Sequence, residues 1–343
     1  MTGAGRHRAI RTQAPFRRTT AVADASHPRA RWAWPRRALA VLGAGLLTCW
    51  AGANAYAAVA LAHGGKNTVE GRDPASVGLR FSDVSYGDGR SAWHVPGAAG
   101  RPVVVVVHGY GNSRSATLEV GPPLHELGYG LLFVNLGYVS TGGPYGGGQR
   151  EADDVADAVA WVGRTLKLPV VLLGFSAGAL AALSAVASGA PVAAVVSDSG
   201  FVGFRDVVAF RAGVRRAFTA PLPLLYPLAS GGSHLVDLGR QLRGGSFRAP
   251  TLVVQGTADE TVSPSNGRRI ARLTGGRLWL LPGVGHADAF HADRLGYVAR
   301  VDQLIRAALP GSPASFSVPS ALTPVCGTAD DKAGPAMCPK RRQ

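Results

Sequence analysis

Five consecutive valines, residues 103–107, place the strongest constraint on the fold of this chain. A strand this apolar and β-branched is buried on both faces, as happens in a parallel sheet covered by helices on either side. The chain therefore needs several such strands, each with neighbours that pack against it. Further apolar runs follow at 130–137, 169–175, 192–200, 249–259 and 277–283.

Segments with helical patterns separate these runs. The segment 150–166 places valines four and three residues apart and has acidic residues in its first turn, as expected for an amphipathic helix. Strand and helix thus alternate along the chain, which predicts a mostly parallel α/β sheet with helices on both faces. The other predicted helices are 177–189, 264–276 and 293–309.

The remaining segments define the predicted domain organisation. Residues 79–95 predict two strands joined around a Gly-Asp-Gly turn, after a polar linker at 63–78. Residues 201–248 are too long for a simple connection and rich in bulky apolar side chains, so we expect a helical cap inserted between two core strands. The core domain then covers 79–310, and 311–343 predicts a tail with little regular structure.

The net charge of +15 is distributed unevenly. Residues 1–37 form a basic arm with nine arginines and one acidic residue, Asp24, so this arm carries eight of those charges. The rest of the chain has no stripe of basic and aromatic residues of the kind that nucleic-acid-binding proteins carry. We therefore expect no nucleic-acid partner.

The basic arm is followed by an apolar segment, 38–62, with no charged side chain over its length. About 20 apolar residues suffice to span a bilayer as a helix. We expect a transmembrane anchor whose arginine-rich end stays in the cytoplasm, which places the core domain on the outer side of the cell membrane. The alternative is a signal peptide cleaved near 53–57, and hence a secreted protein.

The chain carries no motif for a cofactor or a metal. It has neither a phosphate-binding loop nor a dinucleotide fingerprint. Of its three cysteines, Cys49 lies in the apolar segment, and Cys326 and Cys338 lie in the tail, where an exported protein could pair them. No two cysteines have zinc-ligand spacing, so we predict neither cofactor nor metal.

A serine, Ser176, lies between Gly174 and Gly178, where an apolar strand turns into a predicted helix. This Gly-x-Ser-x-Gly pattern is typical of a nucleophile elbow, a tight turn that lifts the hydroxyl clear of the sheet. The turn leaves no room for side chains two residues before and after the serine. The N-terminus of the following helix also favours negative charge at this place.

A serine hydroxyl needs a base to act as a nucleophile. His286 lies in the loop after the last predicted strand, where we expect the base of such a serine. His291, five residues later, is the alternative candidate for the base. An acid must in turn orient the histidine, and Asp259, just past a strand end, completes the chain order Ser, Asp, His. Glu260 and Asp198 remain alternatives for the acid.

The reaction also needs donors for an oxyanion. We expect the backbone N–H of Ala177, directly after the serine, to be one donor. The second should come from the loop after the valine strand, with Tyr110 favoured over Gly111.

The segments "HGYGNSR", "GFSAG", "GTADETVSP" and "GVGH" together resemble the α/β-hydrolase superfamily over residues 79–310. The stretch "GYVSTGGPYGGGQREADDVADAVAWV" is similar to a branch of membrane-anchored or exported serine hydrolases, BEM46-like and prolyl-oligopeptidase-like. The resemblance implies an eight-stranded, mostly parallel sheet. It also implies that Ser176 is the nucleophile, Asp259 the acid and His286 the base.

These expectations predict a serine hydrolase that cleaves an ester, thioester or amide through an acyl-enzyme, with carboxylesterase or lipase activity favoured. Two alternatives stay open: an exported peptidase, and a non-catalytic binding module on the cell surface. The bulky apolar side chains of the cap either line the site of a lipophilic small-molecule acyl substrate or pack the cap onto the sheet. They are Phe201, Phe204, Phe210, Phe218, Leu224, Leu225 and Tyr226.

Overall fold

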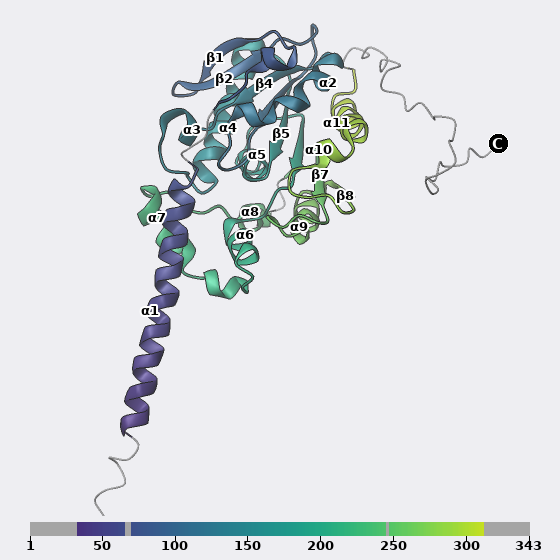
Figure 1. The fold of residues 1–343 in the computed structure, drawn as a ribbon. Helices are drawn as coiled ribbons and strands as arrows, with labels where there is room; N and C mark the ends of the chain where they lie inside the picture. Colours follow the sequence, from purple (N-terminus) through teal and green to yellow (C-terminus); the bar gives the residue numbers. More distant parts are fainter. Residues whose placement is uncertain (1–32, 66–69, 245–246, 312–343) are drawn as a thin grey trace, which may run out of the picture. The chain divides into compact units, whose positions relative to one another are not determined.

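The computed structural model describes residues 33–65, 70–244 and 247–311 (Figure 1). The chain divides into two compact units, Met1–Cys49 and Trp50–Gln343. The boundary falls within helix α1 (Ala33–His63), whose residues 36–49 are exposed. By length and composition, the stretch Arg36–His63 of α1 could cross a membrane.

The second unit is built on one sheet of eight strands. The strand order is β1-β2-β4-β3-β5-β6-β7-β8. β1 and β2 are antiparallel to their neighbours, and the other strands run parallel to one another. The predicted mostly parallel, eight-stranded sheet is thereby confirmed. The strands are β1 (Ser82–Tyr86), β2 (Arg90–Val95), β3 (Val103–Val107), β4 (Gly130–Val134), β5 (Val170–Phe175), β6 (Ala194–Asp198), β7 (Thr251–Gly256) and β8 (Arg277–Leu281).

The helices follow the predicted alternation with the strands. Those of the second unit are α2 (Gly121–Glu126), α3 (Gly137–Thr141), α4 (Gln149–Trp161), α5 (Ala177–Ala187), α6 (Phe204–Arg211), α7 (Leu222–Ser230), α8 (Leu238–Gln241), α9 (Ser265–Thr274), α10 (Ala289–Ala292) and α11 (Arg294–Ala308). Short 3-10 helices are η2 (Pro74–Val77), η3 (Arg114–Val120), η5 (Arg216–Thr219) and η6 (Leu242–Gly244), and a π-helical turn, η4 (Val162–Leu166), extends α4.

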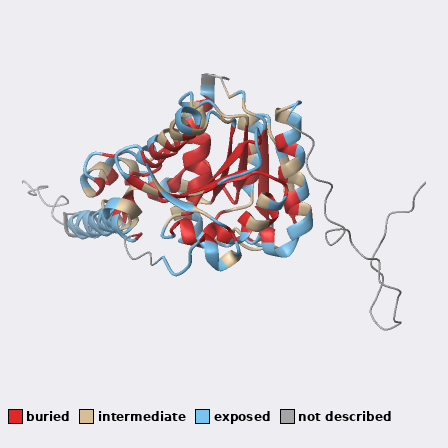
Figure 2. Ribbon diagram, turned by 90° about the horizontal axis from the view of Figure 1, so that it is seen from above, coloured by how far each residue is buried: buried red, intermediate tan, exposed pale blue. Residues whose placement is uncertain are grey.

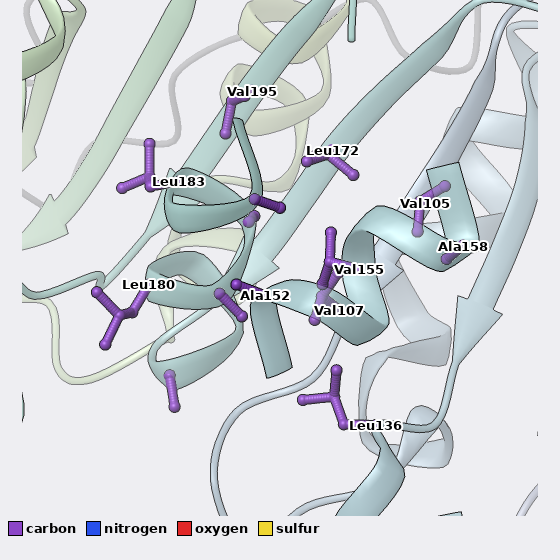
Figure 3. Packing of buried hydrophobic residues seen from close by; sticks show 14 of the residues in the cluster. Val105, Val107, Leu136, Ala152, Val155, Ala158, Leu172, Leu180, Leu183 and Val195 are labelled. Carbon is purple, nitrogen blue, oxygen red and sulfur yellow. The ribbon is translucent and has the colours of Figure 1, made fainter. Parts of the chain in front are cut away.

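The strands separate two apolar cores, because successive side chains of a strand point to opposite faces. On one face, Val105 and Val107 pack with Val155 of α4 and Leu180 of α5 (Figure 3). On the other face, alternate residues such as Val106 pack with α2, α10 and α11. The central strands are consequently buried throughout, as Figure 2 shows.

The segment between β6 and β7, which was predicted to be a cap and is called the cap below, contains α6, η5, α7, α8 and η6. The C-terminal half of α1, which also belongs to the second unit, packs against this cap: Ala58 and Ala62 are buried against Leu222 and Tyr226 of α7. The cap and the end of α1 thus share a small apolar core.

Two segments differ in detail from the expected pattern. The helix predicted at 150–166 ends as an α-helix at Trp161, and Lys167 closes its π-helical turn in a left-handed conformation. Within the predicted linker, Glu70 forms an ion pair of 2.8 Å with Arg114, so this part is attached to the domain. The tail from 312 onward, with Cys326 and Cys338, lies outside the described residues.

Candidate active site

Ser176 lies in the turn between β5 and α5, in a strained conformation with φ 53° and ψ −116°. Such positive φ values are uncommon for a residue with a side chain and persist only where the surroundings enforce them. Here the N–H of Ser176 donates a hydrogen bond of 2.8 Å to the carbonyl of Asp198 at the end of β6. The hydroxyl is therefore presented at the carboxyl edge of the sheet.

The two glycines of the motif are needed because backbone atoms crowd them. A Cβ on Gly174 would overlap the carbonyl of Gly178, and one on Gly178 would overlap the carbonyls of Val107 and His108. A side chain at position 178 would thus clash with the end of β3. The motif alone does not identify this neighbour. Close contact between α5 and β3 brings the serine beside the loop that follows β3.

His286 lies on the loop after β8, and its Nε2 is 2.9 Å from the Oγ of Ser176. Its Nδ1 is 2.7 Å from Oδ2 of Asp259, so one imidazole joins the two side chains. The rival His291 is exposed, and its Nε2 lies 3.5 Å from the carboxylate of Glu119. The structure therefore brings the three predicted side chains together and leaves His291 at the edge of the pocket.

Asp259 is buried and held by four donors. Its Oδ1 accepts backbone N–H bonds from Val262 (2.7 Å) and Thr261 (2.9 Å), and its Oδ2 also accepts a bond of 3.0 Å from Gln255. Burial alone raises the pKa of this carboxyl. The hydrogen bonds from His286 and the backbone outweigh that effect, so the pKa of Asp259 lies below its ordinary value and the carboxylate is ionised.

The two alternative acids do not reach the histidine through a hydrogen bond. Glu260 is exposed. Asp198 is fully buried, and burial raises its pKa to about 6. Its Oδ1 accepts a hydrogen bond of 2.9 Å from the hydroxyl of Ser199.

Ser199 is a residue that sequence reasoning missed. Its Oγ also accepts a hydrogen bond of 2.9 Å from the N–H of Ala287, directly after His286. Both Ser199 and Ala287 have positive φ values, 51° and 54°, so two strained residues meet across the site. Ser199 thus fixes the loop that carries the histidine. The only signal in the sequence is its place just past a strand end, which does not reveal the partner.

The predicted oxyanion donors, Tyr110 and Ala177, line the same pocket as Ser176. Ala177 is the first residue of α5, so its N–H has no partner within the helix. The hydroxyl of Tyr110 donates to the carbonyl of Leu61 in α1 at 2.8 Å, which holds the loop after β3 in place. His108, two residues before Tyr110, is buried. This burial lowers the pKa of His108 to about 4 and keeps the ring neutral.

The pocket has a volume of about 480 Å³, and apolar side chains dominate its wall. Phe201, Phe204, Val207 and Val208 of the cap face it, and Leu61 of α1 completes this side. Polar side chains include Asn112, Thr117 and Thr261, and charged ones include Glu119 and Arg211. Among the residues that the structure describes, no cluster of three or more His, Cys, Asp or Glu side chains could hold a metal ion.

Only part of the apolar cap residues named from the sequence line this pocket. Phe201 and Phe204 do so. Tyr226 and Leu225 instead pack in the core shared with α1. The other three, Phe210, Phe218 and Leu224, are exposed. Their spacing in the sequence does not distinguish the residues that line the pocket from those that pack against α1 or are exposed.

No family model matches the chain, and no curated protein matches it by sequence. Among solved structures, an esterase of Pyrococcus furiosus is similar, with 21% identity and a TM-score of 0.57 over 70% of this chain and 95% of the esterase. A Thermus thermophilus protein is similar with 17% identity and a TM-score of 0.51, over 66% of this chain and 98% of that protein. Together with the sheet order and the serine elbow, these likenesses show that the chain has the α/β-hydrolase fold.

Proposed function

We propose that this protein is a serine hydrolase that cleaves carboxylic esters with an apolar acyl group. One observation carries the proposal: His286 bridges the Ser176 hydroxyl and the Asp259 carboxylate at 2.9 and 2.7 Å, inside a largely apolar pocket. A serine, a base and an orienting acid in this geometry are what acyl transfer requires.

In the first half of the reaction, the neutral imidazole of His286 donates its Nδ1–H to Asp259 and accepts the Ser176 hydroxyl proton at Nε2. The serine oxygen attacks the ester carbonyl carbon, and the ionised Asp259 stabilises the imidazolium that forms. The N–H groups of Ala177 and Tyr110 would bind the oxyanion of the tetrahedral intermediate. Its collapse breaks the bond to the alcohol, which leaves with the proton from Nε2.

In the second half, a water molecule takes the place of the alcohol. His286 accepts its proton at Nε2, and the hydroxide attacks the acyl-serine carbonyl. Breakdown of this second intermediate returns the proton to Ser176 and releases the acid. The same three side chains thus serve both halves, and no cofactor is required.

The pocket wall supports an apolar acyl group. Phe201 and Phe204 pack edge to face with ring centroids 4.8 Å apart, which makes this part of the pocket wall apolar and well packed. Of the acidic and arginine side chains in the lining, Glu119 and Arg211, the first already pairs with Arg72 at 3.2 Å. The mostly apolar wall therefore favours an uncharged acyl chain.

The location of the protein is part of the same proposal. α1 contains a stretch that could span a bilayer, and the arginine-rich arm before it favours a cytoplasmic N-terminus. We therefore place the hydrolase domain on the outer face of the cell membrane, in agreement with the resemblance to the BEM46-like branch of anchored or exported hydrolases.

The proposal is tested with p-nitrophenyl esters of graded acyl length. Val207→Trp narrows the apolar wall of the pocket and should lower kcat/KM for long acyl chains about 10-fold or more while acetate hydrolysis changes little, since methylene contacts in a pocket discriminate on this scale. Leu295→Trp, at an exposed position on α11 outside the pocket lining, is the matched control and should leave the profile unchanged.

Two outcomes of this assay would overturn the ester assignment. If the wild type cleaved peptide amides but no ester, the peptidase alternative would replace it. If the folded wild type cleaved neither, a binding role would replace catalysis.

A further inference from the structure

The exposed large apolar side chains of this protein are confined almost entirely to two elements. Of thirteen such residues in the described chain, seven lie on α1, five lie on the cap, and only Leu295 lies elsewhere. The cap residues are strongly exposed: Phe218 by 56%, Leu224 by 79% and Leu228 by 85%. We call these five the cap patch: Phe210, Val214, Phe218, Leu224 and Leu228.

The cap patch lies on elements that contact α1 within the second unit. The indole N–H of Trp50 donates to the carbonyl of Phe218 at 2.7 Å, and the side-chain amide of Asn54 donates to the same oxygen at 3.0 Å. These bonds fix Phe218 at the level of Trp50 and Asn54 along the helix. They also give Asn54, a polar residue within an apolar segment, its partner.

The position of these bonds along the apolar segment determines how deep Phe218 lies in a bilayer that α1 spans. A bilayer core of about 30 Å takes about 20 helical residues. Counted from Arg37, the last charged residue before the apolar segment, these end near Ala57. At 1.5 Å per residue, Asn54 and Trp50 lie about 5 to 10 Å before that end. If α1 spans the bilayer, Phe218 lies about 5 to 10 Å below the outer edge of the hydrocarbon core, like Asn54 and Trp50. Interfacial helices bury their apolar faces to a similar depth, about 5–10 Å.

The charges beside the cap patch match a membrane surface. Arg211 and Arg215 are exposed, alternate with the apolar side chains of 210–218, and have no acidic partner among the described residues. Arg216 differs, since it pairs with Asp206 at 2.9 Å. Exposed apolar side chains interleaved with unpaired arginines are typical of segments that enter the headgroup layer of anionic bilayers.

We propose that the cap patch docks into the surface of a bilayer that contains anionic lipid, beside α1. The apolar side chains enter the outer part of the acyl region, and Arg211 and Arg215 contact lipid phosphates. Docking itself does not depend on catalysis. One consequence rests on the proposed function: Arg211 and Leu61 line the serine pocket as well, so docking would open this pocket next to the lipid phase.

The proposal is tested on the full chain in vesicles of phosphatidylcholine and phosphatidylglycerol. Cys49, Cys326 and Cys338 are replaced by serine, and one cysteine is introduced by Val214→Cys, Phe218→Cys or, as the control outside the cap, Leu295→Cys. Each cysteine is labelled with the fluorophore NBD. Thermal unfolding checks that each variant is folded.

The emission of NBD should shift to the blue at positions 214 and 218, and nitroxides on the lipid chains should quench most of it. The emission at 295 should stay that of a probe in water. If positions 214 and 218 behaved like 295, docking would be refuted, whether or not α1 holds the protein in the vesicle. This readout needs no turnover, so an inactive enzyme would leave it intact.

A charge variant tests the lipid preference. Arg211→Glu with Arg215→Glu should abolish most of the quenching at position 218 in phosphatidylglycerol vesicles, because the new carboxylates repel lipid phosphates. Arg164→Glu, an exposed arginine on η4 outside the cap, is the matched control and should change nothing. Equal quenching in the double variant and the control would contradict the role of anionic lipid.

Discussion

Replacing His286 by alanine should lower kcat/KM for ester hydrolysis by about 10⁴- to 10⁶-fold, because serine and histidine act as one unit in acyl transfer. Without Nε2 at 2.9 Å, nothing takes the proton from Ser176 when it attacks. The side chain is partly exposed and its loop is also held through Ala287, so the variant should fold. Hydrolysis rates with purified protein, beside thermal unfolding, check this.

The matched control is His291→Ala. His291 lines the same pocket but contacts Glu119 and not the serine, so we expect its loss to change the rate only a few-fold. An equal loss in both variants would show that the two histidines are not distinguished by their distance to Ser176. A larger loss for His291→Ala would make it the base.

The second large effect is expected for Asp259→Asn, a decrease of about 10⁴-fold in kcat. The substitution preserves shape but offers an amide N–H to Nδ1 of His286, which favours the tautomer that cannot accept the serine proton. The ionised carboxylate that would stabilise the imidazolium is also lost. Steady-state kinetics with esters measure the decrease, and fluorophosphonate reactivity should fall in parallel.

Asp198→Asn is the control for the acid. Asp198 contacts Ser199 at 2.9 Å, whereas Asp259 contacts His286 at 2.7 Å. The control should therefore weaken catalysis only through the loop that Ser199 holds, by far less than Asp259→Asn. An active Asp259→Asn enzyme beside an inactive Asp198→Asn enzyme would assign the acid to Asp198.

The fold was predictable because its strongest signals are local. The valines of β3 and the apolar run of β5 can be buried on both faces only in a covered parallel sheet, and the sheet has that form. The placement of Ser176 followed from two glycines at a strand end. The C-terminal end of α4 was harder to predict, because the π-helical turn after Trp161 does not change the apolar periodicity clearly.

The remainder of the site depends on contacts between distant segments. The bond from Ala287 to Ser199 joins residues 88 positions apart, and no sequence pattern specifies it. The fate of the cap phenylalanines is similar: Phe204 lines the pocket while Phe218 is exposed, although both lie in apolar stretches of one segment. The bond from Asn54 in the apolar segment to the carbonyl of Phe218 likewise joins distant residues, and it was not predicted.

The central claim, that Ser176 is an activated nucleophile, is tested most directly by a fluorophosphonate probe, which reacts with the serine of an acyl-transfer site. Full-length wild type and Ser176→Ala are incubated with the probe, and mass spectrometry locates the adduct. We predict a single adduct on Ser176 in the wild type and none in the variant, with thermal unfolding unchanged. A folded wild type that takes no label, or one labelled at another serine, would contradict the account.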